Sequence, residues 1–378
     1  MRRARDCEIP GRCIHPELFD PRNNVVTTTY YLEVKTKFPP SGHLARAMTS
    51  TERHHDRRQF LRNVARQTLH IVKVGAFTVR GRMHRLHTNE AMRATRYYPT
   101  THPALAHWHS PSIEIHPPSA PTSFSVHEIS TLEGVVLLSN VMCNNPRQDA
   151  QGSFSRLANI IPGRGRSSTA RPYNNKVGVL NFANATKPGG GFINGSQAQE
   201  ESIARSSTLY PTLTTIESAA FYNFHRVTHN PYYTHAMIYS PGVEIFRDDD
   251  GGWMSPIAVD VLTSAAVNAK EVRQQTHGGR DRGPQAEYSI ELVMRERMAR
   301  MLCLFELQGV RNLVLGSFGT GVFQNDVGLV AQSWAELLAV PGARFQHSFD
   351  RVFFAIMGHP TIVEFNDVFC RTQARRAR

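Results

Sequence analysis

The segment KVGVLNFANATKPGGGFINGSQAQEESIARSSTLY, residues 176–210, carries the pattern that decides the fold. Its first part, Val177–Phe182, is a short apolar run of the kind that forms a buried strand. The run is followed by Gly189, Gly190 and Gly191, and three successive glycines let backbone N–H groups approach a ligand closely. The letters SIARSSTLY at the end suit a helix. Strand, glycine turn and helix in this order are typical of α/β proteins, which bind ligands at the carboxyl ends of their strands.

The rest of the chain repeats this alternation of strand and helix. Short apolar runs, predicted as buried strands, lie at 135–138, 177–182, 236–239, 313–315 and 352–356. Helical patterns separate them, and two polar segments rich in Gly and Arg, at 163–175 and 274–286, are predicted as loops. The sequence therefore predicts an α/β fold with a largely parallel sheet.

Apolar residues recur at three- and four-residue steps in three segments, which are predicted as amphipathic helices. The first begins at Asp56 as N-cap and ends at Gly75. The second covers 290–305 and ends at Gly309, and the third covers 329–338. The apolar residues of these helices are predicted to form the core.

The charge of the chain is uneven. The formal net charge is +12, and residues 1–100 carry 19 Lys and Arg against 8 Asp and Glu. A basic N-terminal arm attracts polyanions through counterion release, so we expect at most non-specific nucleic-acid contact there. The same charge equally suits a solubilising or targeting tail.

The five cysteines form no CxxC pair, which fits a reducing compartment. We therefore expect an intracellular location, in the nucleus and/or the cytoplasm. No apolar stretch is long enough to span a membrane, so no membrane partner is expected.

Two groups of possible metal ligands are weak. Asp248, Asp249 and Asp250 lack the ligand spacing of a Ca²⁺ loop, so a solvated turn is expected. Four histidines in a proline-rich segment match no zinc spacing: His102, His107, His109 and His116. The sequence therefore predicts no metal and no cofactor.

Two adjacent carboxylates follow the first glycine turn, in Gln199, Glu200 and Glu201. Such a pair can bind sugar hydroxyls and supply one proton donor or acceptor. The alternative is structural, because glutamates in the first turn of a helix complement its dipole. A helix N-terminus lowers the pKa of a carboxyl group, whereas a general acid needs a raised pKa, so the pair alone leaves both interpretations open.

A second glycine-rich turn, in NLVLGSFGTGVFQND at 312–326, joins an apolar strand to a helix that Asp326 caps. Backbone N–H donors and a helix N-terminus at such a turn suit a diphosphate. Val322 and Phe323 stand where a Walker loop needs Lys and Ser or Thr, so hydrolysis of a nucleoside triphosphate is not expected. A purely structural turn is the alternative. The candidate binding residues are Gly316, Ser317, Phe318, Gly319, Thr320, Gly321, Val322 and Phe323.

Together these motifs resemble the microbial-type poly(ADP-ribose) glycohydrolases, a branch of the macrodomain superfamily. The family signature is three glycines followed, after six to eight residues, by Gln-Glu-Glu, and here it is complete at 189–191 and 199–201. The flanking segments NFANATKPGGG, RSSTLY, YSPGVEIFRD, GSFGTGVFQND and RRQFLRNVARQTLHIVKVGAF are also similar to the family. The resemblance covers about 56–95 and 128–370. It implies a macrodomain-like α/β fold, with a mixed, largely parallel sheet flanked by helices and an N-terminal helical extension.

The resemblance also implies an activity, the release of ADP-ribose from poly(ADP-ribose) without a metal. Glu201 would protonate the leaving 2′-oxygen between two riboses and then deprotonate the attacking water. Glu200 would orient ribose hydroxyls. The partners would be poly(ADP-ribose) and ADP-ribosylated proteins. One alternative is a reader that binds ADP-ribose without turnover, and the intact glutamate pair favours the enzyme over it. The other is a nucleic-acid-associated protein that uses the basic arm.

The remaining residues of the site would bind substrate. Asn184 would contact the terminal ribose, and Gly189, Gly190 and Gly191 would pass close to that ribose and the diphosphate. Gln199 of the signature belongs to the same set. The turn at 316–322 would cradle the diphosphate, and Phe323 would pack against the ribose to fix its pose.

The resemblance and the composition together divide the chain into five parts. Residues 98–123 hold six prolines, which break helices and are excluded from central strands. The predicted parts are a basic, mostly irregular arm at 1–50, an N-terminal helical part of the catalytic region at 51–97, a Pro/His-rich surface insertion at 98–127, a macrodomain-like catalytic domain at 128–370 and a basic tail at 371–378.

Overall fold

The computed structural model of the protein describes residues 50–110, 122–144, 176–276 and 282–375. Three predicted features therefore lie outside the described residues: the arm apart from its last residue, the loop at 163–175 and the last three residues of the tail.

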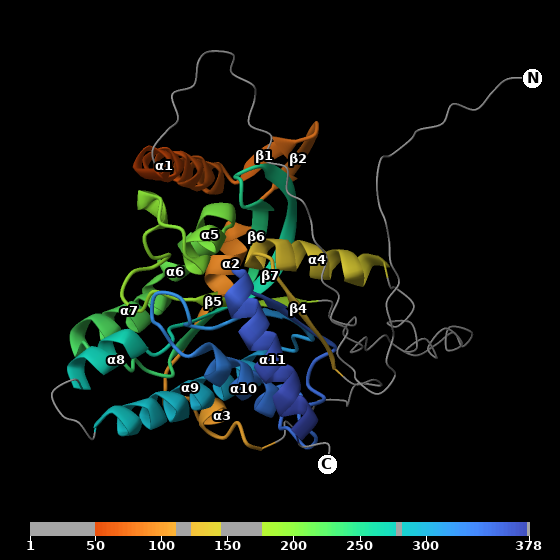
Figure 1. Ribbon diagram of the computed structural model, residues 1–378. Coiled ribbons are helices and arrows are strands. Elements are labelled where there is room, and N and C mark those ends of the chain that lie inside the picture. Colours follow the sequence, from red (N-terminus) through yellow and green to blue (C-terminus); the bar gives the residue numbers. More distant parts are fainter. Residues whose placement is uncertain (1–49, 111–121, 145–175, 277–281, 376–378) are drawn as a thin grey trace, which may run out of the picture.

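The centre of the fold is a seven-stranded sheet in the order β3-β6-β7-β5-β8-β9-β4 (Figure 1). Its strands are β3 (Arg96–Tyr98), β4 (Ser123–His127), β5 (Val177–Phe182), β6 (Met237–Arg247), β7 (Trp253–Ser264), β8 (Asn312–Leu315) and β9 (Arg351–Ala355). From β7 to β4 neighbouring strands pair in parallel, whereas β3, β6 and β7 pair antiparallel. The prediction of a mixed, largely parallel sheet is confirmed, and the strands predicted at 177–182, 236–239, 313–315 and 352–356 correspond to β5, β6, β8 and β9.

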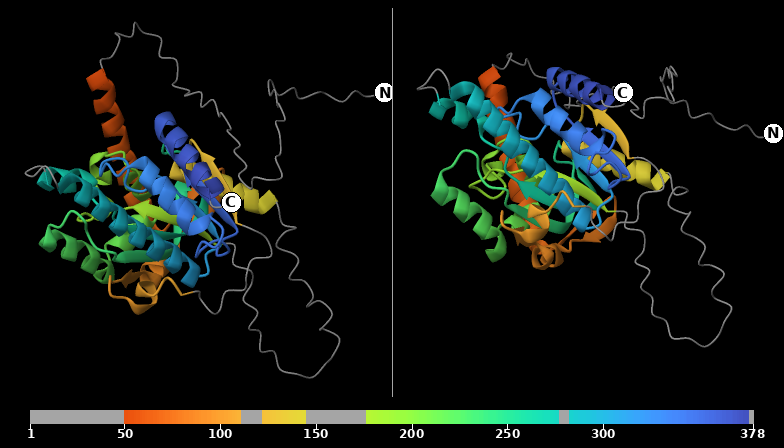
Figure 2. Two further views of the ribbon diagram at one scale, coloured as in Figure 1. Left: turned by 60° about the horizontal axis from the view of Figure 1, so that its bottom comes forward. Right: turned by 90° about the horizontal axis from the view of Figure 1, so that it is seen from below.

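Helices cover both faces of this sheet. The first face carries α3 (Pro103–Ala106), α8 (Ala269–Thr276), α9 (Arg282–Leu307), α10 (Val327–Leu338) and α11 (His359–Arg375). The second carries α4 (Thr131–Asn144), α5 (Gln199–Ser206), α6 (Leu209–Leu213) and α7 (Ile216–Thr228). Figure 2 shows α9, α10 and α11 along one side of the sheet. Successive strand residues serve opposite faces, since Leu180 packs with the first group and Val179 with the second.

The helices predicted at 290–305 and 329–338 are confirmed as α9 and α10. Asp326 caps α10 as predicted, because its Oδ1 accepts a hydrogen bond from Leu329 N at 2.7 Å. The loop predicted at 274–286 is too long, since α8 continues to Thr276 and α9 begins at Arg282.

The strand predicted at 135–138 is wrong, because these residues lie inside α4. The buried residues Leu132, Val135 and Leu138 recur every three residues, which is a helical rather than a strand period. A capping box starts the helix: Ser130 N donates to Glu133 Oε2 at 2.8 Å, and Glu133 N donates to Ser130 Oγ at 3.0 Å. The apolar run thus forms the inner stripe of a helix.

The N-terminal region packs on the second face. Helix α1 (Ser50–Val74) lies against α5 and the short 3₁₀ helix η3 (Phe192–Asn194), and a hairpin of β1 (Ala76–Val79) and β2 (Arg82–Arg85) and helix α2 (Thr88–Ala94) follow it. Gly75, at φ +79°, ends α1 as predicted. The predicted N-cap is wrong: Asp56 lies inside α1, because no Gly or Pro interrupts the helix after Ser50.

The surface insertion predicted at 98–127 is wrong at both of its described ends. Pro103 occupies the first turn of α3, the one helical position where proline is tolerated. Leu105 and Trp108 are buried against the first face, and Trp108 Nε1 donates to Glu296 Oε2 at 2.9 Å. At the other end Ser123–His127 forms the edge strand β4.

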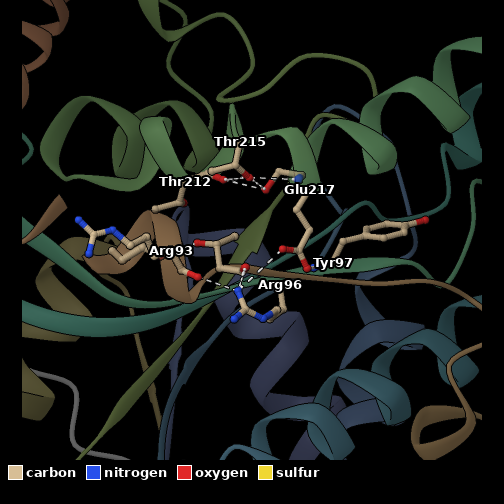
Figure 3. Close-up of polar contacts among 9 residues, drawn as sticks. Arg93, Arg96, Tyr97, Thr212, Thr215 and Glu217 are labelled. Carbon is tan, nitrogen blue, oxygen red and sulfur yellow. Dashed lines mark hydrogen bonds and ion pairs between the residues drawn. The ribbon is translucent and has the colours of Figure 1, made fainter. Parts of the chain in front are cut away.

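The opposite edge strand, β3, is held by helix α7, as Figure 3 shows. Tyr97 N donates to Glu217 Oε1 at 3.1 Å, and Arg96 forms an ion pair with the same carboxylate at 3.8 Å. Thr215 caps α7 by accepting from Ser218 N at 3.1 Å. These contacts fix the start of the helix that later brings Tyr222 and His225 to the site.

Candidate active site

The two glycine-rich turns lie next to each other at the carboxyl ends of the central strands β5 and β8. Strands β5 and β8 are adjacent and parallel, so the turns that follow them emerge together. The rings of Phe182 and Phe318, one after each strand, pack edge to face with centroids 5.5 Å apart. A Cβ on Gly316 would lie 2.6 Å from Ala355 O and 3.2 Å from the Phe182 ring, so only glycine fits there. The turns are far apart in sequence but form one site.

Glu200 is almost completely buried, with 2% of its surface exposed. Its Oε2 accepts from Asn184 N at 2.7 Å, and its Oε1 accepts from Asn181 Nδ2 at 3.3 Å. Burial raises the pKa of Glu200 to about 8 despite these hydrogen bonds, and the nearby Glu201 raises it further. The pKa of Glu200 is therefore raised rather than lowered, because the loss of hydration outweighs the hydrogen bonds that favour the charged form.

Glu201 faces the glycine turn. Its Oε1 accepts from Gly191 N at 2.9 Å, and 9% of the residue is exposed. A Cβ on Gly190, whose φ is +57°, would lie 2.4 Å from this same oxygen and 3.3 Å from Glu200 Oε2. Both carboxylates therefore converge on a backbone position that has room only for glycine.

Gln199 holds the end of β5 in place. Its Oε1 accepts from Phe182 N at 2.8 Å, and its Nε2 donates to Leu180 O at 2.7 Å and to Thr131 Oγ1 at 3.1 Å. Both ends of the amide therefore bind the protein and position the end of β5, and the contact of Gln199 with substrate stays a prediction.

Asn184 shapes the first turn. Its Oδ1 accepts from Thr186 N at 3.0 Å and from Lys187 N at 2.9 Å, which is an Asx turn. Its backbone N–H is also used, by Glu200. Within the described part of the chain its Nδ2 has no acceptor, so this group is the one that Asn184 can offer to a ligand.

The second turn presents backbone donors. Phe318 N donates to Gly316 O at 2.9 Å and Thr320 N to Ser317 O at 3.2 Å, so these two N–H groups are used internally. Among the described residues, no acceptor is found for the other N–H groups of the turn, those of Ser317, Gly319, Gly321, Val322 and Phe323. Several convergent free N–H groups form an anion-binding concavity.

The side chains of this turn differ in their exposure to solvent. Phe318 is fully buried in the core, so its side chain supports the turn, and its contact with substrate stays a prediction. Val322 is 77% exposed. Phe323 is half-buried, and its ring centroid lies 5.8 Å from that of Tyr233.

Several residues at the site were missed by the sequence patterns. Arg297 of α9 is fully buried and donates to Ala265 O at 2.7 Å and to Tyr232 O at 2.8 Å, which fixes the two loops beside Phe323. Tyr222 of α7 is buried, and burial and then Glu200 raise its pKa well above the usual range. An arginine within the apolar stripe of α9 is the signal that could have identified the first.

His225 is a further buried group of this region. Its Nε2 lies 2.8 Å from Thr234 Oγ1, and its ring packs edge to face with Tyr233. Burial, and secondarily the charge of Arg297, lowers the pKa of His225 to about 4, so the ring is neutral at physiological pH. A neutral imidazole here packs and positions the loop that carries Tyr233.

The three aspartates at 248–250 point to different partners. Asp248 Oδ1 accepts from Asp250 N at 3.1 Å and Gly252 N at 2.6 Å, Asp249 accepts from Ser130, and Asp250 pairs with Arg57 at 3.8 Å. Within the described residues, no group of three or more His, Cys, Asp or Glu is arranged to hold a metal ion. No helix in the described ranges is both long and apolar enough to cross a membrane.

Comparisons with known proteins agree with this geometry. The family model of the microbial-type poly(ADP-ribose) glycohydrolase catalytic domain matches residues 65–248. The crystal structure of poly(ADP-ribose) glycohydrolase from Thermomonospora curvata is 33% identical over 84% of this chain and 99% of that chain, with a TM-score of 0.65. The chain belongs to the microbial-type poly(ADP-ribose) glycohydrolases. As a member of this family, it is a glycosidase that acts on poly(ADP-ribose).

Two further structures of the glycohydrolase family contain ligands. The Thermomonospora curvata enzyme bound to the inhibitor ADP-HPD is 33% identical over 84% of this chain and 99% of that chain, with a TM-score of 0.63. The Deinococcus radiodurans enzyme in complex with ADP-ribose is 29% identical over 76% of this chain and 96% of that chain, with a TM-score of 0.57. A comparison with curated protein sequences found no match.

Proposed function

We propose that the protein hydrolyses the ribose–ribose O-glycosidic bond of poly(ADP-ribose), with Glu201 as general acid and base. The observation that carries the proposal is the position of the Glu201 carboxylate. It lies against Gly190 and Gly191, beside a second turn whose free N–H groups can bind a diphosphate. An ADP-ribose unit has a diphosphate next to its ribose, so the two turns match its two chemical parts.

The second turn would hold the diphosphate. The free N–H groups at 317, 319, 321, 322 and 323 provide partial positive charge without a lysine or a metal. The ring of Phe323, supported by Tyr233, would pack against the ribose and fix its pose. Asn184 Nδ2 would donate to a ribose hydroxyl from the opposite turn.

The two glutamates then take different roles. Glu201 would protonate the leaving 2′-oxygen of the neighbouring ribose and afterwards remove a proton from the water that attacks the anomeric carbon. Glu200, with a pKa of about 8, is mostly protonated at neutral pH and can therefore donate a hydrogen bond to a ribose hydroxyl. A neutral Glu200 also adds no negative charge beside Glu201. The bound diphosphate would stabilise the positive charge that develops on the ribose in the transition state.

The test is the full chain incubated with automodified polymer, with free ADP-ribose separated by chromatography. Glu201→Gln should keep its affinity for ADP-ribose, because the amide has the same shape. It should lose about 10²–10⁴-fold in kcat, the usual contribution of a general acid or base. Full activity in this variant would eliminate Glu201 as the proton donor.

A further inference from the structure

The positive charge of the N-terminal region is concentrated in residues 51–100. Residues 1–50 carry 8 Lys and Arg against 5 Asp and Glu, whereas residues 51–100 carry 11 against 3. The polyanion contact predicted for the arm at 1–50 is therefore better placed on α1, the β1–β2 hairpin and α2.

Helix α1 carries a continuous line of basic side chains, which we call the α1 basic stripe: Arg58, Arg62, Arg66, His70 and Lys73. Spacings of four, four, four and three residues place these side chains on one side of a helix. All are exposed except the half-buried Arg62. At 1.5 Å per residue the stripe is about 22 Å long, enough to contact more than one phosphate group.

The arginines and the lysine of the stripe have no carboxylate in ion-pair distance among the described residues. Five arginines in other described helices and loops do have one: Arg273, Arg295, Arg300, Arg311 and Arg344 each pair with a glutamate or aspartate. Like charges four residues apart destabilise a helix, so an unneutralised row of this kind indicates an anionic ligand.

One end of the stripe is connected to the catalytic carboxylate. Arg58 Nε and Arg62 Nε donate to the same oxygen, Asn194 O, at 2.9 and 3.2 Å. Asn194 N donates to Gly191 O at 2.9 Å, and Gly191 N donates to Glu201 Oε1 at 2.9 Å. Helix α1 packs against α5, whose first turn holds this glutamate, and Figure 1 shows it above α5. The stripe therefore starts one loop away from Glu201 and continues along α1 to Lys73.

The guanidinium groups of Arg58 and Arg62 keep N–H donors that a ligand can use. Each of these two arginines uses its Nε to bind the loop, and within the described residues the Nη atoms of both have no acceptor. A guanidinium held in this way is pre-oriented, and its free edge matches two phosphate oxygens.

We propose that the α1 basic stripe binds phosphates of the poly(ADP-ribose) strand that lies outside the cleft, beyond the ADP-ribose unit being cleaved. This inference rests on the proposed function, which places the polymer at Glu201, one loop away from Arg58 and Arg62 of the stripe. A nucleic acid could also meet such a stripe. The connection to Glu201 favours the polymer, because one molecule can then occupy the cleft and the stripe together.

The experiment compares two double variants of the full chain, both in the Glu201→Gln background to prevent turnover. Arg66→Gln/Lys73→Gln removes two charges from the stripe, at residues that do not bind the loop. Arg82→Gln/Arg85→Gln removes two exposed charges from β2, off the stripe, and is the matched control. The dissociation constants for long polymer, free ADP-ribose and single-stranded DNA are measured at several salt concentrations.

The stripe variant should bind long polymer about tenfold more weakly. The slope of the logarithm of its binding constant against the logarithm of the salt concentration should be smaller by about 1.4, because each phosphate contact on a single strand contributes about 0.7. Its affinity for free ADP-ribose should change much less, and the hairpin variant should keep the parent's slope. An unchanged slope in the stripe variant, or an equal loss in both variants, would overturn the proposal. So would a loss confined to single-stranded DNA, which would assign the stripe to nucleic acid.

The outcome is separable from that of the proposed function. If the wild-type chain releases no ADP-ribose from polymer, the proposed hydrolysis is wrong whatever the binding data show. If it does release ADP-ribose but the stripe variant binds polymer as the parent does, only the stripe is wrongly assigned.

Discussion

Replacing Gly190 with alanine should separate the geometry of the catalytic carboxylate from its chemistry. The added Cβ would lie 2.4 Å from Glu201 Oε1 and 2.9 Å from Glu201 Cδ, whereas ordinary contacts begin at 3.4 Å. Since the new Cβ is bonded directly to the backbone and cannot rotate away, the Glu201 carboxylate has to move by about 1 Å. A misplacement of this size costs about 100-fold in rate. We therefore expect Gly190→Ala to lose about two orders of magnitude in kcat.

The same substitution has a backbone cost that needs its own control. At φ +57° a Cβ costs about 1–2 kcal/mol. Gly342 has φ +78° and no atom within 4 Å of an added Cβ, so Gly342→Ala has the backbone cost without the collision. Both variants should therefore unfold at similarly lower urea concentrations, and only Gly190→Ala should lose activity.

The assay is release of free ADP-ribose from automodified polymer, with urea denaturation followed in parallel. A Gly190→Ala variant with wild-type kcat would refute the reasoning, because Glu201 would then tolerate displacement. Equal loss of activity in both variants would also refute it, because the cause would then be stability.

Two further predictions concern buried charged groups. Burial raises the pKa of Glu200 to about 8, so kcat/KM should fall as the pH rises through about 8 and Glu200 ionises. In a pH–rate profile, Glu200→Gln should not show this fall at alkaline pH. In the folded protein Glu200 keeps its proton at pH values above 4.5, the pKa of a glutamate in the unfolded chain, so the free energy of unfolding should also decrease as the pH rises from 4.5 to about 8. A Glu200→Gln variant with the same pH dependence in urea titrations would contradict the raised pKa of Glu200. Arg297→Met leaves Ala265 O and Tyr232 O without their donor, so the free energy of unfolding should fall by about 2–4 kcal/mol, and an unchanged urea midpoint would argue against this role.

Local patterns were sufficient wherever a feature depends on neighbours along the chain. The apolar run before Asn184 predicts β5, Gly75 predicts the end of α1, and Asp326 predicts the cap of α10. They failed at 135–138, where a run of four apolar residues fits a buried strand and a helix equally well. The capping box of Ser130 and Glu133 was the signal that decides between them.

The candidate site divides in the same way. The glycine turns and the pair Glu200 and Glu201 are contiguous motifs, and the resemblance to the glycohydrolases followed from them. The supporting residues Arg297, Tyr222 and His225 come from helices distant in sequence, and no local pattern marks the place where their side chains meet.

The amino-acid sequence alone determined the family, the alternation of strand and helix and the chemical groups of the site, because these are written in residue type and short-range spacing. Only the tertiary structure decided that two turns more than a hundred residues apart meet at the carboxyl ends of neighbouring strands. It also decided that burial keeps Glu200 protonated, and that the basic charge of α1 begins at the loop next to Glu201. Burial and proximity arise from the packing of the whole chain around the sheet, so they are properties of many distant contacts rather than of any one segment.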